Sequence, residues 1–163
     1  MKYDLFPISP DDKESVIDIF NYYIENSFAA YPENKVPYEF FGLFLQSTAG
    51  YPTAIVKDES KTVLGFGLLR PHSPIPTLAG TVEITYFIRP EYTGKGIGST
   101  IMEYLLEGAR EKGLHCILAS ISSLNEGSIR FHIQHGFSEC GRFREVGKKW
   151  GKLFDTVWMQ KLL

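Results

Sequence analysis

The feature that most constrains the fold is a glycine-rich turn that separates a strand-like run from a helix-like run. The run TVEITYFI, residues 81–88, is β-branched and aromatic apart from one acid, which predicts a central strand. The turn YTGKGIGST follows at residues 92–100 and carries three glycines at alternate positions. Apolar residues then recur at helical spacing over residues 97–112, and Gly113 is a candidate C-cap. A strand, turn and helix in this order predict a helix that packs against a sheet.

The rest of the chain predicts an α+β fold, in which a mixed sheet has helices on its faces. The stretch Ser9-Pro10-Asp11-Asp12 begins a first helix, because Ser is a favoured N-cap and Pro fits the first turn. The stretch RPHSPIPTLAG, residues 70–80, contains three prolines and predicts a loop outside the sheet. There is no repeat or linker, so residues 1–163 are expected to form one domain. Further strands are predicted at residues 2–7, 53–57, 63–69, 115–121, 137–146 and 153–162, and further helices at residues 38–46 and 125–134.

Composition places the chain among ordinary soluble globular proteins. Of its 163 residues, 44% are hydrophobic and 22% are charged, and the net charge is -2. A nucleic-acid partner is not expected, because binding to phosphates requires a clustered excess of Lys and Arg. No apolar run approaches the roughly 20 residues that span a bilayer, and the N-terminal residues lack a signal-peptide core, so we expect a cytoplasmic protein without a membrane partner. Cys116 and Cys140 form no CxxC pair and fit reduced thiols better than a disulfide.

The alternating glycines of the turn suit the binding of an anion such as phosphate. Residues without Cβ let backbone N–H groups point into one concavity, and the following helix N-terminus adds free donors and partial positive charge. Lys95 adds a cation and Ser99 adds a hydroxyl. The alternative is a flexible turn between strand and helix. A P-loop is excluded because GxxxxGK[ST] is absent, and the dinucleotide fingerprint GxGxxG fails because Ser99 stands where its third glycine belongs.

Two ordered segments of the chain resemble the GNAT N-acetyltransferases. The segment IRPEYTGKGIGSTIMEYLLEGAREKG is similar to the acyl-CoA-binding strand, loop and helix of the family, whose loop pattern is [Q/R]xxGxG. The segment NEGSIRFHIQHGF, which begins at Asn125, is similar to its Asn-containing helix. Thr93 stands where the family usually has Gln or Arg, so weaker coenzyme binding is expected. The resemblance implies acetyl-CoA as co-substrate, no metal, and coenzyme contacts from Phe87, Ile88, Arg89, Thr93, Gly94, Lys95, Gly96, Ile97, Gly98, Ser99, Asn125 and Ser128.

Further segments resemble one branch of this family, the phosphinothricin and methionine sulfoximine acetyltransferases. They are TVEITYFI, His132, VGKKWGKLFDTVWMQ and, in the first half, FNYYIENSFAAY. The resemblance implies a GNAT fold and transfer of acetyl to the primary amine of a small amino-acid-like substrate. Residues 71–80 lack the basic and aromatic residues common in the branch, with Leu78 where an aromatic is usual, which counts against phosphinothricin itself. The alternatives are a peptide or protein N-terminal acetyltransferase and a non-catalytic CoA-binding module.

Glu83, the acid in the predicted central strand, is the candidate general base. A carboxylate among apolar strand residues is costly unless it is paired or functional, and burial raises its proton affinity. The resemblance implies that the residue at this position removes the proton of the acceptor amine. The alternative is a structural carboxylate that pairs with a nearby Arg or backbone donor.

His132 is the candidate for a second catalytic group. It lies seven residues after Asn125 and therefore near the same face of the predicted helix. GNAT enzymes often have a Tyr here that protonates the leaving thiolate, and the branch that this chain resembles shows His. The alternative is an ordinary surface histidine. His72, His115 and His135 lack metal-ligand spacing such as HExxH and are given no role.

The amine pocket and the oxyanion site have weaker sequence signals. Thr85 lies two residues from Glu83 and so faces the same way, and Tyr31 and Arg70 complete the candidate amine pocket. The developing oxyanion is expected at backbone N–H groups near Phe87, because the central strand must open for pantetheine to lie along it.

A homodimer is expected from the end of the chain. The last two strands are predicted to flank the turn GKKWGK and to end in LFDTVWMQKLL. In that segment, exposed side chains of Phe154 and Trp158 are expected to form an apolar interface.

Overall fold

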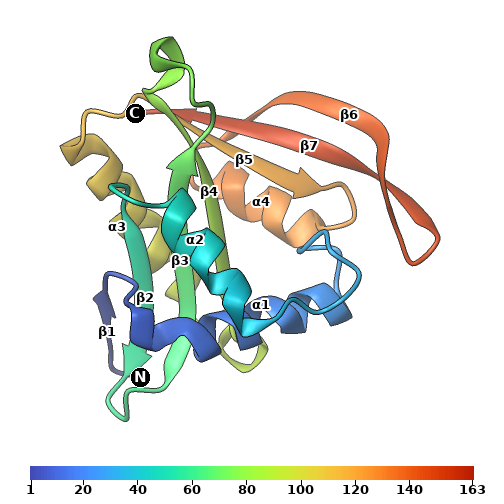
Figure 1. Ribbon diagram of the computed structural model, residues 1–163. Coiled ribbons are helices and arrows are strands. Elements are labelled where there is room, and N and C mark those ends of the chain that lie inside the picture. Colours follow the sequence, from blue (N-terminus) through green and yellow to red (C-terminus); the bar gives the residue numbers. More distant parts are fainter.

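The computed structural model describes all 163 residues, and its centre is a seven-stranded sheet in the order β1-β2-β3-β4-β5-β7-β6 (Figure 1). Helices cover both faces, which confirms the expected mixed sheet of an α+β fold. The strands are β1 (Tyr3–Phe6), β2 (Thr53–Asp58), β3 (Val63–Pro71), β4 (Thr81–Ile88), β5 (Cys116–Ser122), β6 (Ser138–Lys149) and β7 (Lys152–Leu162). The helices are α1 (Lys13–Asn26), α2 (Phe41–Ser47), α3 (Ile97–Glu111) and α4 (Glu126–Gln134).

The pairing of β4 with its two neighbours is unequal. Against β3 it is antiparallel and paired from Val82 to Ile88. Against β5 it is parallel and paired only from Thr81 to Glu83. Since β5 pairs with β7 over its whole length instead, the edge of β4 beyond Glu83 has no strand partner on that side. The sheet therefore splits between β4 and β5, and Figure 1 shows the two strands diverging.

Two apolar cores lie on opposite faces of the sheet. Neighbouring residues of β2 divide between them, with Ala54 and Val56 in one core and Ile55 in the other, as the two-residue period of a strand requires. The first core contains the buried stripe of α3, and the second contains the buried residues of α1 and α2. Helix α3 packs closely on β3 because Gly67 has no side chain: a Cβ there would lie 2.5 Å from Ile101.

The predicted loop at residues 70–80 is wrong at its start. Arg70 and Pro71 continue β3, and they pair with Glu83 and Val82. Proline is tolerated because it ends the strand, and the next residue, His72, supplies the N–H that bonds to the Thr81 carbonyl at 3.2 Å. The extension of β3 brings the side chain of Arg70 beside β4.

The hairpin of β6 and β7 is longer than expected. Its turn contains only Trp150 and Gly151, both with positive φ (51° and 74°), which is the backbone of a tight two-residue hairpin turn. The expected exposure of Phe154 is wrong, because its side chain is only 5% exposed and packs against Phe28 and Tyr31. Trp158, which was also expected to be exposed, is half-buried. None of the helices combines the length and the apolar character needed to cross a membrane.

Candidate active site

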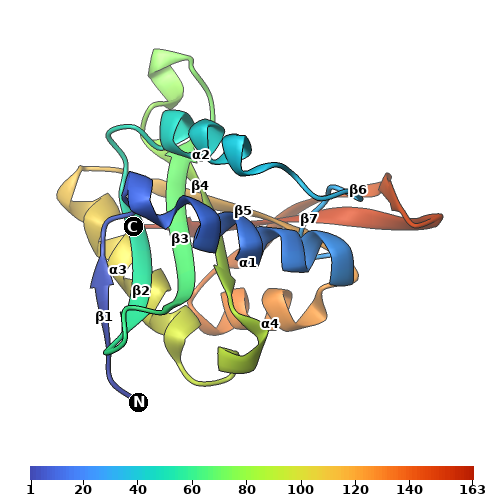
Figure 2. The same cartoon turned by 60° about the horizontal axis from the view of Figure 1, so that its bottom comes forward.

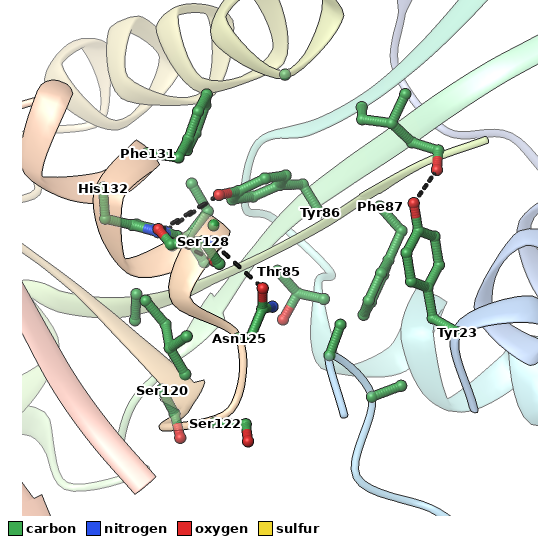
Figure 3. A pocket seen from close by; sticks show the side chains of 18 of the residues that line it. Tyr23, Thr85, Tyr86, Phe87, Ser120, Ser122, Asn125, Ser128, Phe131 and His132 are labelled. Atoms are coloured by element: carbon green, nitrogen blue, oxygen red, sulfur yellow. Dashed lines mark hydrogen bonds between the residues drawn. The ribbon is translucent and has the colours of Figure 1, made fainter. Parts of the chain in front are cut away.

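A cavity of about 790 Å³ opens where β4 and β5 separate (Figure 3). Its size is within the usual range for small-molecule and cofactor sites. The glycine turn and the start of α3 line one part of it, and residues 29–32, the end of β3 and Glu83 line another. The cavity therefore joins the predicted coenzyme loop to the predicted amine pocket, which are far apart in the sequence.

The glycine turn offers open backbone to this cavity. Gly94 and Gly96 have φ of 72° and 84°, a left-handed conformation that favours glycine, and a Cβ on either would meet no atom within 4 Å. Gly96 is the N-cap of the 15-residue helix α3, so free N–H groups of the first turn adjoin the turn. Thr93 and Gly98 also line the cavity. This arrangement fits the diphosphate of a coenzyme, since helix N-termini and exposed backbone amides bind phosphate.

Several of the predicted coenzyme residues have other contacts. Ile97 is buried in the apolar core, Arg89 donates to the backbone carbonyl of Val63, and the Lys95 ammonium lies 5.1 Å from the Tyr92 ring. Their side chains are not among those that line the cavity.

Ser99 lines the cavity, and its hydroxyl pairs with a histidine that the sequence left without a role. The Ser99 Oγ lies 3.1 Å from His135 Nε2, while His135 Nδ1 is 2.8 Å from the Phe131 carbonyl. His135 must therefore carry its proton on Nδ1, and Ser99 donates to Nε2. The Ser99 hydroxyl thus has a protein partner within the cavity lining, in addition to its predicted contact with the coenzyme.

The free edge of β4 carries Phe87 and Ile88 along the cavity. The Tyr23 hydroxyl donates to the Ile88 carbonyl, and burial raises the pKa of Tyr23 to about 12, so this donor keeps its proton at neutral pH. The Phe87 ring packs 5.1 Å from the Tyr23 ring and 5.5 Å from the Phe20 ring. Tyr23 of α1 thus occupies one carbonyl near the end of β4, and no strand pairs with β4 beyond Glu83 on the β5 side.

Glu83 lines the cavity as part of a row of polar side chains on β3 and β4. Arg70 donates to Glu83 Oε1 at 3.1 Å and to Thr85 Oγ1 at 2.9 Å, and His72 Nδ1 lies 3.0 Å from Glu83 Oε2. The Glu83 side chain is 15% exposed. The pairing with Arg that we gave as the structural alternative is therefore present, in a carboxylate that also faces the cavity.

His72 is a contact of Glu83 that sequence reasoning missed. Its side chain is 37% exposed and lies outside the cavity lining, behind the carboxylate. Only the extension of β3 to Pro71 brings it there, and a proline-rich segment gives no signal for that extension.

Tyr31 reaches the cavity from the segment after α1. Its hydroxyl lies 3.0 Å from Ser120 Oγ of β5, and its ring stacks on Phe154 at 5.5 Å. Burial raises the pKa of the Tyr31 hydroxyl, and the hydrogen bond with Ser120 acts in the opposite direction. All three predicted amine-pocket residues, Tyr31, Arg70 and Thr85, thus lie on the cavity with Glu83.

Helix α4 holds the remaining candidates. Asn125 is its N-cap and accepts from the Ser128 backbone N–H at 3.3 Å, as Figure 3 shows. His132 is only 2% exposed, so the alternative of a surface histidine is wrong. Its Nδ1 lies 2.7 Å from the Ser128 carbonyl and so carries the proton, which leaves the Nε2 lone pair to accept from the Tyr86 hydroxyl at 3.3 Å.

Tyr86 is the second residue that the sequence analysis missed. It lines the cavity beside His132 and Phe131 (Figure 3). Burial lowers the pKa of His132 and raises the pKa of Tyr86, so both are neutral at neutral pH. The alternation of side chains along β4 gives one signal for Tyr86. Its side chain lies on the face opposite Glu83 and Thr85, and it carries a hydroxyl group on the face where Ile84 and Ile88 join the apolar core.

Comparison with known proteins assigns the chain that forms this cavity to a family. Residues 16–137 of the chain match the model of the Acetyltransferase (GNAT) family. The chain is 32% identical to an L-methionine sulfoximine/L-methionine sulfone acetyltransferase of Pseudomonas paraeruginosa, over 91% of this chain and 88% of that protein. It is 30% identical to the phosphinothricin N-acetyltransferase of Streptomyces coelicolor, over 94% and 92%.

Solved structures agree with these matches. A GNAT superfamily phosphinothricin acetyltransferase from Sinorhizobium meliloti in complex with AcCoA superposes with a TM-score of 0.94 at 28% identity, covering 100% of this chain and 89% of that chain. The resemblance read from the glycine turn and the Asn125 segment is confirmed. The chain belongs to the acetyltransferase (GNAT) family.

Proposed function

We propose that this enzyme transfers the acetyl group of acetyl-CoA to the primary amine of a small amino-acid-like substrate. The observation that carries the proposal is the polar row of Arg70, Glu83 and Thr85, which shares one cavity with the glycine turn. Relatives named for methionine sulfoximine and phosphinothricin support the substrate class.

At the coenzyme end, backbone groups supply the binding. The residues present fit acetyl-CoA, because the open amides at Gly94 and Gly96 suit a diphosphate and the free edge of β4 suits a chain of amides such as pantetheine. When bound, acetyl-CoA supplies a thioester to be attacked. A backbone N–H of β4 near Phe87 is then the donor for the developing oxyanion.

At the amine end, Glu83 is the proposed general base, acting directly or through one water. Arg70 and His72 each bond one of its oxygens, which fixes the orientation of the carboxylate. The guanidinium of Arg70, 38% exposed, also places a positive charge at the cavity, where the carboxylate of an amino-acid-like substrate would pair with it.

Tyr86 and His132 form the proposed acid side of the site. The Tyr86 hydroxyl donates to His132 Nε2, and His132 is itself fixed through Nδ1 to the Ser128 carbonyl. His132 also lines the cavity, but it is only 2% exposed, and its Nε2 lone pair is already used by the Tyr86 hydroxyl. For the transfer, the Tyr86 O–H turns from His132 Nε2 to the leaving sulfur and gives its proton to it, and the phenolate that results takes a proton back from solvent. His132 positions the hydroxyl between turnovers by accepting its hydrogen bond.

The proposed homodimer would use the β6–β7 hairpin. Phe154 is no longer part of that argument, but four apolar side chains of the hairpin are about half exposed or more: Phe143, Val146, Trp150 and Leu153. Light scattering at high concentration measures the mass, and a single monomeric species contradicts the dimer.

A panel of amines tests the function as a whole. The measurement is release of CoA thiol from acetyl-CoA in the presence of methionine sulfoximine, phosphinothricin, ordinary amino acids and short peptides. Turnover with one or more of the small amino-acid-like amines is expected. A clear preference for peptides would replace the proposal by an N-terminal acetyltransferase. Binding of acetyl-CoA without turnover of any amine would favour a non-catalytic module.

A further inference from the structure

The buried ammonium group of Lys149, at the end of β6, has no part in the proposed chemistry. Its side chain is 0% exposed, and its Nζ donates to the backbone carbonyls of Ile24, Ser27 and Ala30, each at 2.7 Å. An ammonium has three N–H donors, so every donor is used. A buried charge is costly unless it is bonded in this way, which points to a local role for these three contacts.

The three carbonyls belong to the C-terminal end of α1 and to the segment that follows it. Ile24 lies in the last turn of the helix, where carbonyls lack intrahelical partners and carry partial negative charge. Ser27 and Ala30 belong to residues 27–33, which form neither helix nor strand and which we name the acceptor loop. Residues 29–32 of this loop line the cavity at its amine end.

Further contacts join the acceptor loop to the same end of the hairpin. The Trp150 backbone N–H donates to Glu33 Oε1 at 2.7 Å, and the Trp150 ring meets Phe28 edge-on at 5.3 Å. The Phe154 ring stacks on Tyr31 at 5.5 Å. We name Lys149, Trp150 and Phe154 the hairpin clamp. Both ribbon views show the segment after α1 passing close to this hairpin (Figures 1 and 2).

The clamp itself depends on a glycine opposite Phe154. Gly147 of β6 pairs with Phe154 of β7, and a Cβ at Gly147 would overlap the Phe154 ring. The absence of that side chain lets the ring lie across β6 toward the acceptor loop. The hairpin is therefore shaped to hold this loop and is not simply near it.

We propose that the hairpin clamp sets the amine end of the cavity, and that Lys149 is its principal positioning residue. Lys149 fixes the loop backbone, and the fixed backbone places the Tyr31 hydroxyl 3.0 Å from Ser120 Oγ. Lys149 does not line the cavity, so it acts through the loop. The kinetic consequence rests on the proposed amine acetyltransferase function, whereas the ordering of the loop does not.

The inference predicts a defect confined to one end of the cavity. The coenzyme end is built from the glycine turn, the edge of β4 and α4, none of which the Lys149 ammonium contacts. Loss of the clamp should therefore weaken use of the amine and leave acetyl-CoA affinity unchanged. A general loss of stability would weaken both.

The test compares Lys149→Met with Lys148→Met, which removes the same charge from an exposed neighbour on the same strand. Hydrogen exchange of the full-length protein is followed by mass spectrometry in peptides that cover the acceptor loop. Exchange there should rise in Lys149→Met and stay at the wild-type rate in Lys148→Met. Equal exchange in the two variants overturns the proposal.

The kinetic arm uses the best amine found by the panel. In Lys149→Met, kcat/KM for the amine should fall by on the order of 10- to 100-fold, because displacement of positioning groups by about 1 Å has costs of that order. The Kd of acetyl-CoA, measured by calorimetry, should not change. A parallel loss of acetyl-CoA affinity contradicts the proposal.

A second variant covers the case in which Lys149→Met does not fold. Glu33→Ala removes the bond to the Trp150 N–H from an exposed residue, so the fold should survive. Faster exchange in the acceptor loop and a smaller loss of kcat/KM for the amine are expected. Unchanged exchange in this variant counts against the clamp. If the wild type acetylates no amine, the proposed function fails, and the exchange experiment still decides the clamp.

Discussion

Replacing Glu83 by Gln separates its proposed role as a base from its role in an ion pair. The amide keeps the shape of the side chain and can still accept from Arg70, but it has no basicity. A hydrogen bond to a charged group contributes about 1.5–3 kcal/mol. Because Arg70 is 38% exposed, solvent screening reduces this, and we expect a loss of stability of about 1 kcal/mol. For a domain of this size, that loss lowers the Tm by about 2–4 °C.

The expected loss of turnover is much larger. A positioned general base contributes on the order of 100- to 10,000-fold, which corresponds to about 2.7–5.4 kcal/mol of transition-state stabilisation. Acetyl-CoA affinity should stay nearly constant, because the glycine turn and the β4 edge bind it. The loss of turnover should shrink at high pH, where more of the amine arrives already deprotonated.

The assay is CoA release with the best amine, alongside thermal unfolding with and without acetyl-CoA. Glu107→Gln is the matched control, since it removes a carboxylate that pairs with Arg110 at 3.3 Å on the surface of α3. Normal turnover in folded Glu83→Gln refutes the role of Glu83 as a base. An unfolded variant shows instead that its pair with Arg70 is structural.

Three further predictions concern the glycine turn and the acid side. Gly96→Val should abolish the rise in Tm that acetyl-CoA causes, because it adds a side chain at a left-handed φ of 84° beside the cavity. The control Gly98→Ala should retain most of the rise in Tm, because its Cβ would lie at an ordinary 3.5 Å from the Phe131 ring. An unchanged rise in Tm in folded Gly96→Val contradicts the phosphate site. Tyr86→Phe should lower kcat by on the order of 100-fold with little change in the Kd of acetyl-CoA, and normal kcat excludes it as the acid. Since burial lowers the pKa of His132, the unfolded chain binds a proton below pH 6.5 that the folded chain does not, so stability should fall as the pH drops from 6.5 toward the folded pKa, with a slope of at most about 1.4 kcal/mol per pH unit from this group. Denaturant titrations of wild type and His132→Gln measure that slope, and equal slopes contradict the assignment.

The order of the elements and the position of the glycine turn could be predicted because their signals are local. Periodicity over residues 81–112 specifies a strand, a turn and a helix, and each signal lies within a few residues of the element that it predicts. The same holds for Asn125, which caps the helix that begins at the next residue.

For Glu83, the sequence could indicate the type of partner but not its identity, and for His132 it indicated no partner. A carboxylate paired with an Arg was the alternative interpretation of Glu83, but the identity of Arg70 and His72 depends on the register of β3 against β4 beyond a proline. The partner of His132 is Tyr86, which lies 46 residues away in the sequence. The exposure of Phe154 was wrongly predicted for the same reason, since Phe28 and Tyr31 cover it from the other end of the chain.

The two ends of the cavity therefore differ in how they are built, and this bears on specificity. At the coenzyme end, Gly94 and Gly96 act through backbone that a short local motif determines. At the amine end, each wall depends on contacts between distant segments: Tyr31 with Ser120, and Lys149 with the acceptor loop. A substitution in the β6–β7 hairpin can consequently reshape the amine end while the coenzyme end stays intact. Residues outside the cavity lining, Lys149 first among them, should then alter the choice of amine.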